Sequence, residues 1–302
     1  MLNHKPKLIV ICGPTATGKT DLALEMAHKF NGEIITADSR TIYQEMNIGT
    51  AKPTMEQRLK IPNYLIDFVP LDQEFTVAEF KKEALKHIDE IIHHYKIPFL
   101  VGGTGLYISS IVDNLDIPHV PPDKKLRLRL EKKIIKYGLD YLWQKLVKLD
   151  PDATGFVQRQ NPRRVIRALE VCLKTKKPFS ELRKKNESLF NCLQLAVKIS
   201  KRVLFEKINQ RVEEMMKKGL VEEVRSLTKK YPLSLSSLNT IGYQEIIAYL
   251  KNKISLDEAV DLIKKNTHHY ARRQATWFKK DKNVKWICRY EEAEKMIKDF
   301  LS

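Results

Sequence analysis

The chain has 302 residues, of which 43% are hydrophobic and 30% are charged, and its formal net charge is +17; this composition is typical of a globular protein with an ample core. No apolar run approaches the roughly 18–20 residues that span a bilayer, and no cleavage site follows the N-terminal residues, so we expect neither a membrane segment nor a secretory signal. The four cysteines lie far apart without a C-x-x-C pair, which argues against a zinc site or disulfides and fits a reducing cytoplasm.

The N-terminal part of the chain is predicted to hold two strands joined by a helix. Lys7–Cys12 is a short apolar run that ends in glycine, as a buried parallel strand does. Apolar residues at helical spacing over Lys19–Phe30 predict a helix, which Asn31 and Gly32 end. A second strand is predicted over Glu33–Ala37, and polar residues follow it at once.

The next segments continue this alternation. Tyr64–Val69 and Pro98–Val101 are strand candidates, and Thr76–Tyr95 between them has the apolar spacing of an amphipathic helix. The last of these strands runs into the glycine-rich turn Gly102–Gly105. Because strands alternate with helices, we expect an α/β fold with a parallel sheet flanked by helices, of the P-loop NTPase type.

The pattern changes near residue 120. Prolines interrupt the chain, and the residues that follow are helical and basic through about Asn186. A strand over Leu193–Ile199 then resumes the sheet, and Val284–Cys288 is a last strand after a mostly helical stretch. We therefore predict a P-loop core domain of residues 1–120 and 191–302, with an all-helical basic domain inserted at residues 121–190.

Two segments hold the whole positive excess. Pro121–Leu195 has 19 basic and 8 acidic residues, and Lys264–Arg289 has 9 basic residues and one acidic residue. This distribution predicts a polyanionic partner larger than a metabolite, the alternative being solvated charge on helix surfaces. Arg163, Arg164 and Arg167 stand at an expected helix start, where the helix dipole disfavours cations, so phosphate contacts would account for them.

A phosphate-binding loop follows the first strand. The run Gly13-x-x-x-x-Gly18-Lys19-Thr20 matches the full P-loop pattern between a predicted strand and a predicted helix. Loop N–H groups and Lys19 suit phosphate oxygens, and the Thr20 hydroxyl suits a Mg²⁺ ion. The pattern leaves open whether the ligand is ATP, another nucleotide or another diphosphate. The predicted diphosphate-binding residues of the loop are Gly13, Thr15, Ala16, Thr17, Gly18, Lys19 and Thr20, with Thr20 also the metal ligand.

Two polar residues follow strands that we expect beside the P-loop strand. Open α/β sheets bind ligands beyond the carboxyl ends of their strands. Asp38 stands at such an end and can bind Mg²⁺, stabilise the structure or act as a general base. Thr104 follows the glycine turn after another strand, and it either faces the same crevice or caps a helix.

Further motifs follow the P-loop in a fixed order. They are Asp38–Tyr43 (DSRTIY), Met46–Pro53 (MNIGTAKP), Leu100–Tyr107 (LVGGTGLY), Pro162–Glu170, Arg211, Ile241–Tyr243 and Arg272–Phe278 (RRQATWF). In this order the chain resembles the tRNA dimethylallyltransferases, also called tRNA isopentenyltransferases, over nearly its whole length. The combination of the first two motifs is far more specific than the P-loop.

The resemblance implies an activity and roles for particular residues. Enzymes of this family transfer a dimethylallyl group from its diphosphate to the exocyclic amine of the adenosine 3′ of the anticodon. The resemblance implies that Asp38 is the general base on that amine, with Thr104 within hydrogen-bond reach. It also implies that the P-loop, Arg211 and Mg²⁺ hold the departing diphosphate. Flipping this adenosine out of the stacked anticodon loop costs a few kcal/mol, which is less than flipping a base out of a duplex.

The implied partners are tRNA, gripped at its anticodon stem-loop by the helical insertion, and dimethylallyl diphosphate. We expect a cytoplasmic enzyme of the bacterial type, acting as a monomer. The residues that we assign to tRNA contact are Ser39, Arg40, Thr41, Tyr43, Arg127, Arg163, Arg164, Arg167, Gly242, Tyr243, Arg272 and Arg273. Aromatic residues stand among the basic residues of Lys264–Arg289, and their side chains can either stack on RNA bases or be buried in the protein.

The sequence departs from the family pattern at His268, where the family usually has an arginine; a contact made there would depend on pH. Three other functions remain open. A P-loop kinase of nucleotides or small molecules would explain the P-loop but not the basic insertion. An adenylate isopentenyltransferase would need no large basic surface. A nucleotide-gated RNA-binding protein would use Asp38 only as a metal ligand.

Overall fold

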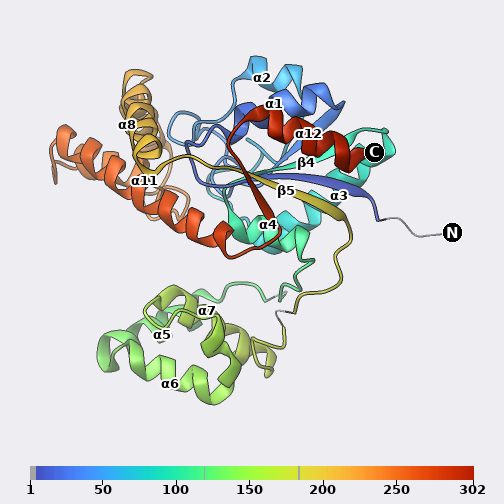
Figure 1. Ribbon diagram of the computed structural model, residues 1–302. Coiled ribbons are helices and arrows are strands. Elements are labelled where there is room, and N and C mark those ends of the chain that lie inside the picture. Colours follow the sequence, from blue (N-terminus) through green and yellow to red (C-terminus); the bar gives the residue numbers. More distant parts are fainter. Residues whose placement is uncertain (1–4, 119, 183) are drawn as a thin grey trace. The chain divides into compact units, whose positions relative to one another are not determined.

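The computed structural model describes residues 5–118, 120–182 and 184–302 (Figure 1). The chain divides into two compact units, one formed by the N-terminal part through Val112 together with Leu189–Ser302, and the other by Asp113–Ser188. We predicted the inserted domain at residues 121–190, so the second unit begins earlier than expected. The reason is that the two extended segments leading into and out of it pair with each other, through an antiparallel bridge between Leu115 and Lys185.

A single parallel sheet of six strands forms the centre of the first unit. Its strand order is β3-β2-β4-β1-β5-β6, and each neighbouring pair runs parallel. This arrangement confirms the predicted α/β fold. The strands are β1 (Lys7–Cys12), β2 (Gly32–Thr36), β3 (Asn63–Tyr64), β4 (Ile97–Gly102), β5 (Asn191–Val197) and β6 (Val284–Ile287).

Helices cover both faces of the sheet because the strands are apolar on both (Figure 1). Leu8 and Val10 of β1 pack with Phe80 and Ile88 on one face, against α3 (Val77–His93) and α4 (Gly105–Val112). Ile9 and Ile11 of β1 pack on the other face against α1 (Lys19–Lys29) and α12 (Tyr290–Leu301). The side-chain alternation of a strand, with a period of two, separates the two cores. We did not predict α12.

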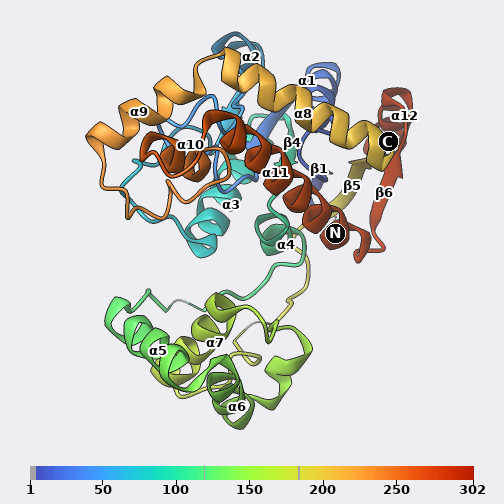
Figure 2. The same cartoon turned by 90° about the vertical axis from the view of Figure 1, so that its left-hand side faces the viewer.

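A third core lies beside the sheet and supports the loop after β2. It packs Ile42, Met46 and Leu71 of that region against helices from the C-terminal part of the chain. Figure 2 shows these helices together, and α8 and α11 contact each other. The helices are α8 (Lys201–Lys217), α9 (Leu220–Lys230), α10 (Tyr243–Leu250) and α11 (Leu256–Lys279), and α2 (Met55–Lys60) precedes β3.

The predicted strand at Tyr64–Val69 is wrong over most of its length, since β3 ends at Tyr64. Leu65 and Asp67 each have a φ of 58°, and a strand does not accommodate this left-handed conformation. The chain turns there, and only a single bridge joins Val69 to Tyr43. These turns place Asp67 beside the loop after β2, which becomes important for the site.

The second unit is helical, as we predicted for the insertion (Figure 2). Its helices are α5 (Lys124–Tyr137), α6 (Leu139–Leu149), the short 3-10 helix Pro151–Gly155 and α7 (Pro162–Thr175). Leu130, Leu142, Leu146 and Leu169 form a small core of their own. Within the described parts of both units, none of the helices combines the length and the apolar character that crossing a membrane requires.

Candidate active site

A cavity of about 460 Å³ lies at the carboxyl ends of the central strands of the first unit. Four segments that are far apart in the sequence line it: the P-loop, the residues around Asp38, the loop of Thr50–Pro53, and the face of α8 that carries Lys207 and Arg211. The position agrees with the rule that ligands bind beyond strand ends in open α/β sheets. The cavity therefore brings Asp38, Arg211 and the P-loop together.

The P-loop has the geometry of a phosphate cradle. Gly18 has a φ of +86° directly before α1, a conformation that glycine adopts at little cost, and the first N–H groups of α1 have no partner within the helix. Inside the loop the Thr17 hydroxyl donates to the Pro14 carbonyl at 3.0 Å, which fixes its curvature. Thr15, Ala16, Gly18, Lys19 and Thr20 line the cavity, whereas Gly13 and Thr17 are buried within the loop.

Two cations converge on this cradle. Lys19 donates to the Pro14 carbonyl at 3.2 Å, and Arg211 donates through Nη1 to the Thr15 hydroxyl at 3.2 Å. The pKa of Lys19 is lowered from its ordinary 10.5 to about 8, chiefly by burial; the Asp38 charge opposes the change and the Arg211 charge adds to it. Burial likewise lowers the pKa of Arg211. Burial disfavours the charged forms of Lys19 and Arg211, and a bound dianion or trianion would stabilise those forms again. The cavity therefore favours an anion.

A hydrogen bond from Ser39, the residue after Asp38, connects the Asp38 loop to Thr104. The Ser39 N–H donates to the Thr104 hydroxyl oxygen at 3.0 Å, and one Asp38 carboxylate oxygen accepts from the Arg40 N–H at 2.9 Å. The Thr104 side chain is thus committed to the Asp38 loop, and α4 starts at the residue after it. The remaining carboxylate oxygen of Asp38 is suited to accept a proton from a bound group.

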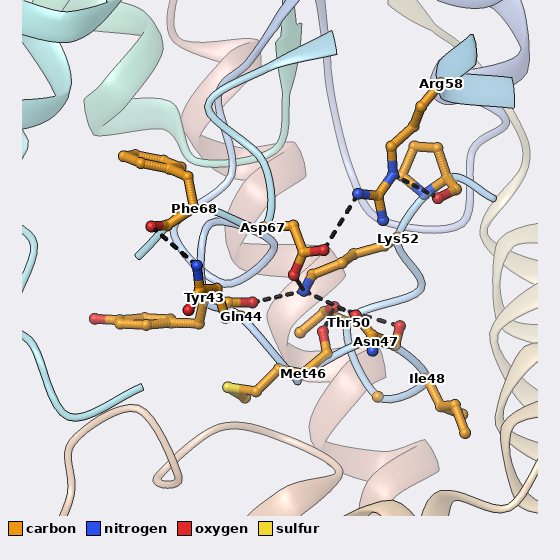
Figure 3. Close-up of polar contacts among 12 residues, drawn as sticks. Tyr43, Gln44, Met46, Asn47, Ile48, Thr50, Lys52, Arg58, Asp67 and Phe68 are labelled. Carbon is orange, nitrogen blue, oxygen red and sulfur yellow. Dashed lines mark hydrogen bonds and ion pairs between the residues drawn. The ribbon is translucent and has the colours of Figure 1, made fainter. Parts of the chain in front are cut away.

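Lys52 holds the loop that forms one wall of the cavity (Figure 3). Its side chain is 2% exposed, and its ammonium donates to Asp67 at 2.6 Å, to the Tyr43 carbonyl at 2.6 Å and to Asn47 at 3.0 Å. Arg58 pairs with the other Asp67 oxygen at 3.4 Å. This network joins the segments after β2 and β3. We missed it, because Lys52 attracted attention only as part of a family motif.

Glu223 of α9 fixes the same loop from the opposite direction. Its carboxylate accepts from the N–H groups of Asn47, Ile48 and Gly49 at 2.8–3.2 Å and from the Tyr243 hydroxyl at 2.7 Å. A Cβ atom at Gly49 would lie 2.4 Å from the Tyr243 ring, so only glycine fits there. Four donors thus converge on one carboxylate, and we did not predict this contact either.

Several residues that we assigned to tRNA contact are buried. Tyr243 has no exposed surface, Gly242 is buried, and Tyr43 and Thr41 are 6% and 7% exposed. The Tyr243 side chain packs on Gly49 and positions the loop, and its contact with RNA stays a prediction. Thr41 lines the cavity, and its buried hydroxyl has no hydrogen-bond partner among the described residues.

The arginines of the second unit fall into two kinds. Arg127 forms two hydrogen bonds with Glu170, at 2.8 and 2.9 Å, and Arg167 forms one with the same carboxylate at 2.6 Å. The Glu170 side chain is fully buried, so these two arginines compensate its charge and hold α5 to α7. Arg163 and Arg164 are exposed at the start of α7, and in the described part of the chain neither has an acidic partner within 4 Å.

On α11, Arg272 and Arg273 are exposed, with the Arg272 guanidinium 5.1 Å from the Phe205 ring. His268 stacks on the same ring at 4.0 Å, and its pKa is lowered by burial and by the charge of Arg272. This histidine therefore favours the neutral form where the family pattern has a cation. All four cysteines are free, and no group of three or more His, Cys, Asp or Glu in the described ranges could hold a metal ion.

Comparisons with known proteins identify the family of the chain. The family model described as IPP transferase matches residues 41–281. The chain is 46% identical to the tRNA dimethylallyltransferase of Acetivibrio thermocellus over 298 residues, covering 97% of this chain and 95% of that one. It is 41% identical to the tRNA dimethylallyltransferase of Halothermothrix orenii over 306 residues, covering 97% and 93%.

Solved structures give the same result. The full-length tRNA isopentenylpyrophosphate transferase of Bacillus halodurans is similar with a TM-score of 0.73 and 36% identity, over 98% of this chain and 96% of that one. A eukaryotic dimethylallyltransferase acting on tRNA is similar with a TM-score of 0.75 and 30% identity, over 90% of this chain and 69% of that one. The match of the family model over most of the chain, together with these relatives, shows that the chain belongs to the IPP transferase family.

Proposed function

We propose that the protein transfers a dimethylallyl group from dimethylallyl diphosphate to the exocyclic amine of the adenosine 3′ of the anticodon in tRNA, releasing diphosphate. The observation that carries the proposal is the cavity in which a P-loop, Arg211 and the Asp38 carboxylate meet. Membership of the IPP transferase family and the exposed arginines of the second unit support it further.

The phosphate end of the cavity binds and stabilises the leaving group. Negative charge grows on the diphosphate as its bond to carbon breaks, and the loop N–H groups, Lys19 and Arg211 oppose that charge. Because Lys19 is desolvated, its interaction with the leaving group is stronger than in water. The Thr20 hydroxyl, which lines the cavity, would help to hold a Mg²⁺ ion, and that ion would add positive charge at the leaving group.

Asp38 acts as the general base on the nucleophile. An aromatic amine is a weak nucleophile, so removing its proton as the new carbon–nitrogen bond forms lowers the barrier. One Asp38 oxygen is held by the Arg40 N–H, which leaves the other for the amine. Thr104, fixed by the Ser39 N–H, supplies a hydroxyl beside the same centre.

Exposed arginines supply the affinity for tRNA. Arg163 and Arg164 of α7, and Arg272 and Arg273 of α11, present guanidinium groups to solvent. Such groups bind backbone phosphates and release counterions, which makes affinity depend on salt. Arg127 and Arg167 contribute indirectly in this proposal, by holding the helices of the insertion around Glu170.

Competition between labelled substrates separates this function from its alternatives. The protein is incubated with Mg²⁺, unmodified tRNA, AMP, dimethylallyl diphosphate labelled in the prenyl group and ATP labelled at the terminal phosphate. We expect prenyl label on the tRNA alone. Label on free AMP would indicate an adenylate isopentenyltransferase, transfer of labelled phosphate would indicate a kinase, and tRNA binding without any transfer would indicate a binding protein.

An isosteric substitution tests the base. Asp38→Asn removes the proton acceptor but keeps the shape and the acceptor for the Arg40 N–H, so kcat should fall at least about 100-fold. The Kd values for tRNA and for inorganic diphosphate should change less than about threefold. Turnover close to that of the wild type would show that another group takes the proton.

A further inference from the structure

One face of α11 contacts the turn that carries Thr104. Tyr270, Gln274 and Trp277 follow one another at the i, i+4, i+7 spacing of a helix face, and Tyr270 lies beside the Thr104 side chain. A Cβ atom at Gly103 would lie 2.3 Å from Gln274 Nε2. At Gly105 it would lie 2.3 Å from Trp277 Nε1. The side chains of α11 therefore leave no room for a Cβ atom at either glycine.

Gln274 in the middle of this face joins two loops of the cavity. Its side-chain oxygen accepts from the Thr15 N–H at 2.9 Å, and its side-chain nitrogen donates to the Gly103 carbonyl at 2.8 Å. The residue is only 6% exposed, so these bonds form away from water. The P-loop follows β1 and the Gly103 turn follows β4, and one amide side chain satisfies a backbone group of each.

The contact extends to the cation on α8. Thr15 is held at its N–H by Gln274, and its hydroxyl accepts from Arg211. The position of Thr15 is thus fixed from two sides, and Arg211 has a defined partner at the edge of the cradle. A displacement of the P-loop would shift Lys19 and Arg211 relative to Asp38.

We propose that Gln274 is a positioning residue that sets the distance between the diphosphate cradle and the turn of Thr104, which holds the Asp38 loop on the other side of the cavity. This inference rests on the proposed function, in which the diphosphate leaves at the cradle and the amine reacts beside Asp38. The amide is suited to the task because it offers one acceptor and one donor in a fixed geometry. Neither a carboxylate nor an apolar side chain offers both.

Gln274→Glu gives a test with a pH signature. The ionised carboxyl still accepts from the Thr15 N–H but opposes the Gly103 carbonyl oxygen, whereas the protonated carboxyl can donate to it. Burial and the carbonyl raise the pKa of the introduced group, so its protonated form returns as the pH falls. We expect kcat about 100-fold below wild type at pH 8, since a displacement on the order of 1 Å can cost this much.

The ratio of variant to wild-type kcat should then rise at least about tenfold between pH 8 and pH 6. The other ionisable groups around the cavity are the same in both proteins, and a matched control reports whether they alone make the ratio depend on pH. Gln274→Met is the matched control, because it fills the same space without either hydrogen bond, and its ratio should be low at every pH. Thr276→Ala, on the exposed side of α11, should behave as wild type.

A readout besides activity is the Kd for inorganic diphosphate with Mg²⁺, measured by calorimetry, which should rise at least about fivefold in Gln274→Met. This value separates the two proposals: a wild type that binds diphosphate but transfers no prenyl group defeats the proposed function alone. A flat ratio for Gln274→Glu would overturn the positioning role. If that variant does not fold at pH 8, a kcat of Gln274→Met within twofold of wild type would overturn it instead.

Discussion

Replacing Lys52 with methionine should destabilise the first unit and disorder the wall of the cavity. The substitution keeps the length of the side chain but removes an ammonium group with three partners: Asp67 and the Tyr43 carbonyl at 2.6 Å, and Asn47 at 3.0 Å (Figure 3). Breaking a buried ion pair typically costs about 3–5 kcal/mol. The Asp67 side chain is 33% exposed and keeps Arg58, so we expect a smaller loss, about 2–4 kcal/mol.

Urea denaturation at pH 7, followed by circular dichroism, measures this loss as a change in the free energy of unfolding. Lys60→Met is the matched control, because Lys60 is 71% exposed and pairs with Glu56 of its own helix. It should change stability by less than about 0.5 kcal/mol. A loss for Lys52→Met below about 1 kcal/mol would refute the reasoning, since losing three hydrogen bonds from a buried ammonium would then cost almost nothing.

Three further changes have definite outcomes. Above pH 8, inorganic diphosphate should bind with the uptake of up to about one proton, because the ligand raises the lowered pKa of Lys19. Calorimetry in two buffers that differ in ionisation enthalpy would measure this uptake, and equal binding heats in the two buffers would contradict it. Gly49→Ala should cost about 1–3 kcal/mol of unfolding free energy, through a clash with the tyrosine ring beside it. Gly155→Ala, with open space around it, should cost less than about 0.5 kcal/mol by the same measurement, and equal losses would exclude the clash. Charge reversal at Arg163 and Arg164 should reduce the salt slope of tRNA binding by about 1 for each arginine, and an unchanged slope would remove their phosphate role.

The phosphate cradle could be predicted from the sequence because it is local. A strand, a glycine-rich turn and a helix start follow within 14 residues of Lys7, and the geometry of such a run is largely independent of the rest of the chain. The alternation of strands and helices predicted the parallel sheet for the same reason. The inserted helical unit was visible as a change in pattern, although its first residues, Asp113 and the bridge at Leu115, were not.

The supports of the site could not be predicted, because each depends on long-range contacts. Glu223 lies 174 or more residues from the N–H groups it binds, and Gln274 lies 259 residues from Thr15. No spacing rule relates such pairs in one sequence. The same limit applies to Tyr243: in one sequence an aromatic residue of such a motif can equally bind RNA or pack on a glycine, and its packing on Gly49 becomes visible only in the fold.

Mapping of the modified nucleoside tests the central claim most directly. Unmodified tRNA is incubated with the protein, dimethylallyl diphosphate and Mg²⁺, then digested, and the fragments are sequenced by mass spectrometry. We expect a single dimethylallyl group, on the adenosine directly 3′ of the anticodon, and none when Asp38→Asn replaces the wild type. A tRNA that stays unmodified, or a dimethylallyl group on any other nucleotide, would contradict the account.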